Sequence, residues 1–350
     1  MQQADITSIT RELAGLVAER YVFPGLAAEI SQLLDSRLGD GRYAAVPDEE
    51  SLARAVTVDL QSLNGDKHLR LLHSAAELPE RGDNAAELAA MTDYADRTAG
   101  GIARADRLDG NVGYLDLRPL LFPPLVAGEA VAAAMTLIAP TDALLIDLRR
   151  CLGGSPDTVA MLCSYLFGAE PVHLIDVIGR PGADGTAQVR QSWTMPFTPG
   201  RRFGPDKPVF VLTSGTTFSG GEELSYDLQQ LGRATVVGER TRGGAHPTER
   251  FRIRPHLQAA IPVARALSPA SGGNWEGAGV HPDVEVPAGE AVGAAYQRAL
   301  AHVVTLGDDG ARAETAAEAR RALDAWSGDD PSGAPAGRGT VAAASGAAPA

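Results

Sequence analysis

In the first 63 residues, hydrophobic positions recur at the three- and four-residue spacing of amphipathic helices. Three such stretches follow one another: ITRELAGLVAERYVF, LAAEISQLLDSRL and ESLARAVTVDLQSL. Pro24-Gly25 separates the first two, and Gly39-Asp40-Gly41 ends the second. Short amphipathic helices with short links predict an N-terminal three-helix domain over residues 1–65.

After residue 66 the pattern changes to short apolar runs that alternate with helical segments. The predicted strands are LRLLHS, NVGYLDLR, DALLIDLR, PVFVLTS and ATVVGE, and the predicted helices are GEAVAAAMTLI, TVAMLCSYLF and GEELSYDLQQLG. This alternation predicts an α/β core, placed at residues 66–295. Residues 76–105 are polar and weakly patterned. A helical segment is expected at 296–326, and the Gly/Ala/Pro-rich tail 327–350 is expected to be disordered.

The composition narrows the class of partner. The 350 residues carry 44 acidic and 31 basic side chains, a formal charge of −13, which disfavours nucleic acid and anionic lipid as partners. Two cysteines, Cys151 and Cys163, exclude a disulfide framework and a thiolate zinc site. No secretory signal or membrane-length apolar run is visible, so we expect a cytoplasmic protein. A homo-oligomer remains open.

The stretch PVFVLTSGTTFSGGEELSYDLQQLG is the richest in candidate chemistry. A buried strand leads into a turn of small residues, and Ser219 comes directly before an amphipathic helix. Free backbone N–H groups and the positive end of the helix dipole at that point help to hold an oxyanion. The structural alternative is that Ser219 only caps the helix, with Glu222 closing an S-x-x-E capping box.

A second loop, in IDLRRCLGGSPD, also follows a buried strand. Its adjacent glycines, Gly153 and Gly154, would let a backbone N–H approach a substrate atom. An ordinary strand-to-helix turn explains them equally well. Neither G-x-G-x-x-G nor G-K-[ST] is present, so the loop does not indicate phosphate binding.

Seven histidines occur, and none forms an H-x-x-x-H or H-E-x-x-H pair, so no metal or other cofactor is expected. His68 lies on a turn with Asp66 beside it. A lone histidine is more often a hydrogen-bonded structural residue than a catalytic base.

Taken together, four segments resemble serine peptidase family 41, which includes the C-terminal processing proteases and tricorn. They are GDKHLRL, the strand-GG-helix segment ending in CSYLF, the segment from VFVLTSG to GGAHP, and GNWEGAGVHPDVEVP. The similarity is greatest to the branch of interphotoreceptor retinoid-binding protein modules and their bacterial relatives. It covers the chain up to about residue 290.

The resemblance implies site residues. Ser219 would be the nucleophile, and the N–H of Gly220, with that of Gly153 or Gly154, would form the oxyanion hole. Processing proteases use a lysine about 25 residues after the serine, but position 244 is glycine and no lysine follows Lys207. The tricorn-like alternative implies His68 as the general base and Glu276 as its carboxylate partner. A lightly perturbed imidazole would place the acid limb of kcat/KM near pH 6–7.

The resemblance also implies a crotonase-like spiral core. The peptide-binding PDZ domain of processing proteases is not expected, because only about 35 residues separate His73 from the strand at 111. The leading prediction is a serine hydrolase that acts through a Ser219 acyl-enzyme on a peptide or a small acyl substrate. The alternatives are a non-protein ester, lactone or amide as substrate, or a silent module that binds apolar ligands. Residues 170–205 would form either an apolar lip or core packing.

Overall fold

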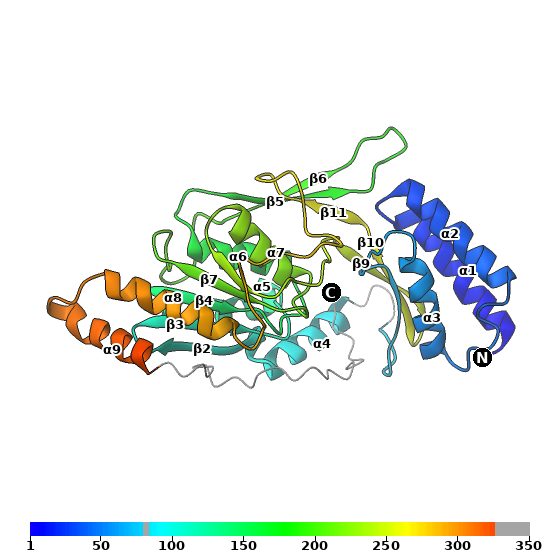
Figure 1. Cartoon of the computed structure of the whole chain (residues 1–350). Helices are drawn as coiled ribbons and strands as arrows, with labels where there is room; N and C mark the ends of the chain where they lie inside the picture. Colours follow the sequence, from blue (N-terminus) through cyan, green and yellow to red (C-terminus); the bar gives the residue numbers. More distant parts are fainter. Residues whose placement is uncertain (80–83, 326–350) are drawn as a thin grey trace.

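The structure is a computed structural model that describes residues 1–79 and 84–325. The predicted disordered tail, 327–350, lies outside the described residues. The molecule is elongated, with the N-terminal helices at one end, the helices α8 and α9 at the other and a mixed sheet between them (Figure 1). No helix in the described ranges is long and apolar enough to cross a membrane.

A six-stranded sheet forms the centre, in the order β12-β8-β7-β4-β3-β2. Its strands are β2 (Ile102–Leu108), β3 (Val112–Leu117), β4 (Ala143–Asp147), β7 (Val209–Thr213), β8 (Thr235–Gly238) and β12 (Val284–Glu285). Neighbours are parallel except for β2, which pairs antiparallel with β3 at the edge. Strands β3, β4 and β7 are buried along their whole length, which is why they are continuous apolar runs.

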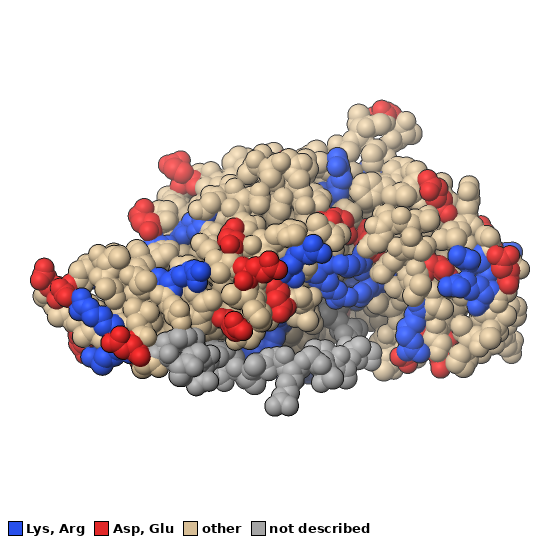
Figure 2. All heavy atoms as spheres, in the orientation of Figure 1, with Lys and Arg blue, Asp and Glu red and all other residues tan. Residues whose placement is uncertain are grey.

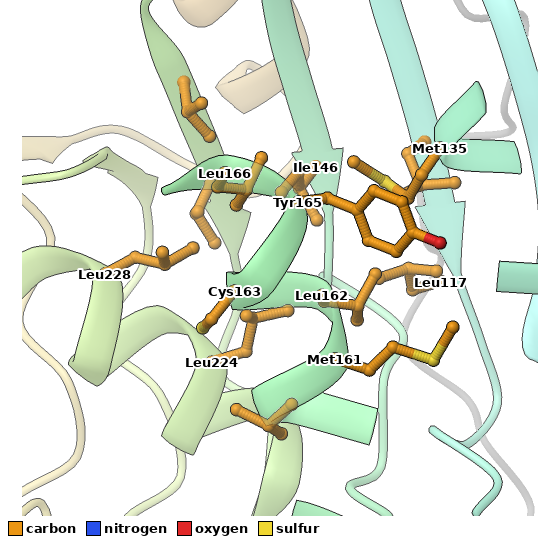
Figure 3. Packing of buried hydrophobic residues seen from close by; sticks show 14 of the residues in the cluster. Leu117, Met135, Ile146, Met161, Leu162, Cys163, Tyr165, Leu166, Leu224 and Leu228 are labelled. Carbon is orange, nitrogen blue, oxygen red and sulfur yellow. The ribbon is translucent and has the colours of Figure 1, made fainter. Parts of the chain in front are cut away.

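Helices cover both faces of this sheet. The covering helices are α5 (Pro124–Ile138), α6 (Pro156–Leu166) and α7 (Gly220–Gln230) on one face, and α8 (Ala291–Thr305) and α9 (Ala313–Asp324) on the other. Alternate residues of β4 serve the two cores: Ile146 faces the first set and Leu145 faces the second. Figure 3 shows side chains of α6 packed with Leu224 and Leu228 of α7.

The N-terminal helices pack on a second sheet. They are α1 (Gln3–Arg20), α2 (Pro24–Gly39) and α3 (Glu49–Gln61), which confirms the three predicted helices. The sheet has the order β1-β10-β9, from β1 (Arg70–His73), β9 (Thr248–Arg254) and β10 (Leu257–Pro262), all antiparallel. One face of it completes the hydrophobic core of the helices, so this core combines chain segments almost 200 residues apart.

The remaining elements fall in stretches for which the sequence pattern is weak. Helix α4 (Asn84–Arg97) and the turn η1 (Ala99–Gly101) lie in the segment that predicted no element. A third antiparallel sheet, β11-β5-β6, is built from β5 (His173–Gly179), β6 (Val189–Trp193) and β11 (Ala264–Leu267). Much of the segment 170–205 is therefore a β-hairpin, the one that projects beside β11 in Figure 1.

Candidate active site

The two glycine-rich loops singled out in the sequence lie side by side. Strands β4 and β7 are adjacent and parallel, so their carboxyl ends place residues 148–155 next to residues 214–219. Hydrogen bonds join the loops: Thr217 Oγ1 donates to the carbonyl of Leu148 at 2.9 Å, and Phe218 N–H donates to that of Cys151 at 3.1 Å. The turn that carries Ser219 is thus fixed to the neighbouring loop.

Ser219 has an unusual backbone conformation, with φ 50° and ψ −121°. A non-glycine residue with positive φ is strained, and such strain is typical of a nucleophile held on a sharp strand-to-helix turn. Its N–H donates to Glu222 Oε2 at 2.9 Å, so the predicted link between these two residues exists.

The glycines give this turn close contact with the loop after β4. Gly153 and Gly154 have φ of 119° and 132°, values that favour glycine. A Cβ on Gly153 would lie 2.8 Å from Ser219 Cβ, and one on Gly220 would lie 2.7 Å from the Gly154 carbonyl oxygen. Within the described ranges, the N–H groups of these three glycines donate no hydrogen bond. They are therefore available to an oxyanion near Ser219.

A cavity of about 950 Å³ opens at this point. Ser219, His68 and a second histidine, His246, all line it. Arg190 of the segment 170–205 lines the cavity, whereas Trp193, Met195, Pro196 and Phe197 are not among its lining residues. Instead Trp193 stacks on His173, with ring centroids 4.4 Å apart.

His68 lies against Phe218, the residue that precedes Ser219. Its ring stacks on Phe218, with centroids 4.5 Å apart and planes 28° from parallel. The Nδ1 atom is buried and has no hydrogen-bond partner in the described part of the chain. Burial lowers the pKa of His68 from 6.5 to about 4, further than a lightly perturbed imidazole would give. The ring is therefore neutral, the form that a general base requires.

Asp66 and Glu276 contact His246 rather than the ring of His68. Asp66 Oδ2 lies 2.8 Å from His246 Nδ1, while Asp66 Oδ1 accepts the backbone N–H of His68 at 3.0 Å. Glu276 Oε2 lies 3.5 Å from His246 Nδ1 and accepts the N–H of Ala245 at 2.6 Å. Among the described residues, no hydrogen bond or ion pair joins Glu276 to His68.

The ligand atoms of Asp66, His246 and Glu276 lie within 4.8 Å of one another, the arrangement closest to a metal site. However, the hydroxyl of Tyr21 donates to the same Asp66 oxygen that bonds His246. Two hydrogen-bonding groups already use that oxygen, so we interpret the cluster as a buried hydrogen-bond network. Sequence reasoning missed His246, although its position two residues after the family's lysine site was a usable signal.

Glu222 does more than close a capping box. Its carboxylate is fully buried and, besides Ser219 N–H, accepts from Thr241 Oγ1 and Gly243 N–H at 2.5 Å and from Gly244 N–H at 2.9 Å. Burial raises its pKa, and these hydrogen bonds oppose the rise. One carboxylate thus connects the Ser219 turn to the loop 241–244.

Gly244, at the position of the lysine in processing proteases, packs directly against the rings of Phe218 and His68. Its carbonyl accepts Trp275 Nε1 at 2.8 Å, so its backbone is held on both sides. A Cβ there would lie 2.3 Å from Phe218 Cε2 and 2.7 Å from His68 Cε1. The stacked rings therefore occupy the space into which a side chain at 244 would extend.

Comparison with known proteins gives the family of this chain. The model of peptidase family S41 matches residues 111–286, which hold both loops, Ser219 with helix α7, and Glu276. The chain belongs to peptidase family S41. Residues 2–102 match the N-terminal domain that this family has in eukaryotic interphotoreceptor retinoid-binding protein. This S41 chain is accordingly a serine-type peptidase by family.

Solved structures agree on the fold. A candidate peptidase from Parabacteroides merdae superposes with a TM-score of 0.54 at 17% identity, over 82% of this chain and 90% of its own. A lipoprotein from Streptococcus agalactiae gives 0.52 at 14% identity, over 79% and 91%. The photosystem II D1 C-terminal processing protease gives 0.48 at 15% identity, over 81% and 93%.

Proposed function

We propose that this S41 peptidase cleaves peptides through an acyl-enzyme on Ser219, with His68 as general base. The observation that carries the proposal is the strained Ser219 turn at a cavity that His68 also lines, beside unbonded glycine N–H groups. The strained backbone of Ser219, the neutral imidazole of His68 and the free glycine N–H donors together suit acyl transfer.

In the proposed reaction, Ser219 Oγ attacks the peptide carbonyl carbon and its proton passes to His68. The N–H of Gly220, with that of Gly153 or Gly154, stabilises the negative charge on the carbonyl oxygen. The C–N bond then breaks, and the imidazolium returns the proton to the leaving amine. Water attacks the ester in a second round and gives a proton to His68; the C–O bond to Ser219 Oγ then breaks, and His68 returns the proton to that oxygen, which leaves the acid product and free Ser219.

Glu276 is proposed to act indirectly, by positioning a loop and not by contact with the reacting groups. Its contact with Ala245 N–H and its proximity to His246 hold the loop against which the His68–Phe218 stack packs. Glu276 is thus a positioning residue for the loop, whereas the sequence resemblance implied a direct partner of His68.

Labelling with an alkyl fluorophosphonate, read by intact mass and peptide mapping, tests the proposal. We expect a single adduct on Ser219, none in Ser219→Ala, and a rate reduced at least a hundredfold in His68→Ala. Peptide turnover by the double variant should be little lower than turnover by either single variant, because the two groups act as one unit. Ser155→Ala is the matched control, since Ser155 lines the same cavity.

An adduct that persists in Ser219→Ala would place the nucleophile elsewhere. A His68→Ala variant that labels at the wild-type rate while His246→Ala does not would transfer the role of base to His246. No adduct at all on folded protein would favour a binding module.

A further inference from the structure

Among the charged side chains that line the mostly apolar cavity at Ser219, six are positive and two are negative, although the chain as a whole carries a charge of −13. The basic residues in its lining are Lys67, Arg70, Arg97, Arg190, Arg242 and Arg250. Its acidic lining residues are Asp93, which pairs with Arg97 at 2.5 Å, and Glu223. Figure 2 shows Lys and Arg gathered between the half of the molecule with the six-stranded sheet and the half with the N-terminal helices.

Strand register places two of these arginines in one row. Arg70 of β1 and Arg250 of β9 each lie directly across from Ala260 of β10, and all three line the cavity. Residues opposite one another across a sheet point to the same face, and the alternate residues pack on the N-terminal helices. The small side chain of Ala260 leaves space between the two guanidinium groups.

Three of these cations, Arg70, Arg242 and Arg250, form no ion pair in the described part of the chain, whereas Arg97 pairs with Asp93. Within the described ranges, no carboxylate lies within 4.0 Å of these three or of Arg190, although Arg190 acts on Glu223 by its charge: burial raises the pKa of Glu223, and Arg190 opposes that rise. Arg70 Nε is buried without a hydrogen-bond partner, and burial and the charge of Arg242 lower the pKa of Arg70. Unpaired cations held close together are stabilised by an anion from outside the chain.

The positive wall reaches the nucleophile. The Arg242 guanidinium carbon lies 4.6 Å from the centroid of the Phe218 ring, the residue directly before Ser219. Lys67, next to His68 in the chain, donates through Nζ to the carbonyl of Arg242. A ligand group that binds these arginines would therefore be part of the substrate whose bond Ser219 attacks.

We propose that the cavity selects peptides with a carboxylate close to the scissile bond, bound by Arg70 and Arg250, with Arg242 beside the nucleophile. This inference rests on the proposed function, because it names the substrate class of the same site. A peptide offers a carboxylate either at its C-terminus or on a Glu or Asp side chain, and both suit the bidentate geometry of guanidinium groups.

Calorimetric titration of Ser219→Ala protein with four pentapeptides separates these sources without turnover. The probes are Ala-Ala-Glu-Ala-Ala and Ala-Ala-Gln-Ala-Ala, each with a free-acid and an amidated C-terminus. We expect the doubly neutral peptide to bind about 10- to 100-fold more weakly than the doubly acidic one, the usual size of one or two charge-assisted hydrogen bonds. Loss on amidation alone identifies the C-terminus, and loss on Glu→Gln alone identifies the side chain.

Arg70→Gln and Arg250→Gln should each reduce this preference at least fivefold. Arg252→Gln is the matched control, because Arg252 lies two residues along the same strand but pairs with Glu77 at 3.2 Å. Melting temperature checks that each variant folds. Equal binding of acidic and neutral peptides, binding of none of them, or an equal effect of Arg252→Gln would overturn the proposal. Fluorophosphonate labelling of wild-type protein reports separately on Ser219, so failure of the proposed function is recognised independently.

Discussion

Replacing Gly244 with alanine adds one methyl group at the point where the catalytic proposal is most sensitive. The added Cβ would lie 2.3 Å from Phe218 Cε2, whereas ordinary contacts begin near 3.4 Å. Hydrogen bonds to Glu222 and Trp275 hold the Gly244 backbone, so the rings must move instead. The required movement of the Phe218–His68 stack is about 1 Å, and a misplacement of that size costs about a hundredfold in rate.

The cost in stability should be modest by comparison. Overpacking of this kind typically costs about 1–3 kcal/mol, which leaves a protein of this size folded. We therefore expect Gly244→Ala to lower the melting temperature by a few degrees and to slow fluorophosphonate labelling of Ser219 by about a hundredfold. Intact-mass time courses and thermal unfolding measure the two effects on one sample.

Gly273→Ala is the control, because the nearest atom to a Cβ there is the Tyr226 hydroxyl oxygen at 3.5 Å, an ordinary contact. It should leave both measurements unchanged. Labelling of Gly244→Ala at the wild-type rate would refute the reasoning, because it would show that the His68–Phe218 stack can move without loss of chemistry, or that His68 is not the base.

Three further predictions follow from buried charges. Glu222→Gln should lower stability by about 2–4 kcal/mol and slow labelling, because the amide nitrogen would face N–H donors; an effect under 0.5 kcal/mol in urea unfolding would restore the simple capping role. Because folding lowers the pKa of His68 from 6.5 to about 4, the unfolded chain binds a proton between these pH values that the folded chain does not. The free energy of unfolding should therefore drop by at most about 3 kcal/mol from pH 6.5 to 4, and His68→Gln should reduce that drop. The rate of fluorophosphonate labelling should stay constant down to about pH 5. Burial raises the pKa of Asp227, whose carboxylate oxygens have no hydrogen-bond partner among the described residues, so Asp227→Asn should raise the melting temperature more at pH 8 than at pH 4, and equal shifts would contradict this.

Much of the fold could be predicted because its signals are local. The apolar runs that became β4 and β7 are buried on both faces, and the helices that follow them have the expected spacing. Strand β9 was missed although TERFRIR alternates polar and apolar residues. Its arginines face the cavity or solvent, so the segment resembles an exposed loop in sequence. Only the tertiary structure shows that the N-terminal helices cover its apolar face.

The sequence by itself determined the setting of the proposed nucleophile: a serine between a buried strand and a helix, with two glycines after the neighbouring strand. Only the tertiary structure decided which groups surround it. Asp66 and His246 are 180 residues apart in the chain, yet their side chains meet at 2.8 Å. The row of Arg70 and Arg250 likewise depends on the register of strands from opposite ends of the sequence. Such contacts arise from the packing of whole elements, and no local pattern of residues encodes which distant side chain will face a given histidine or arginine.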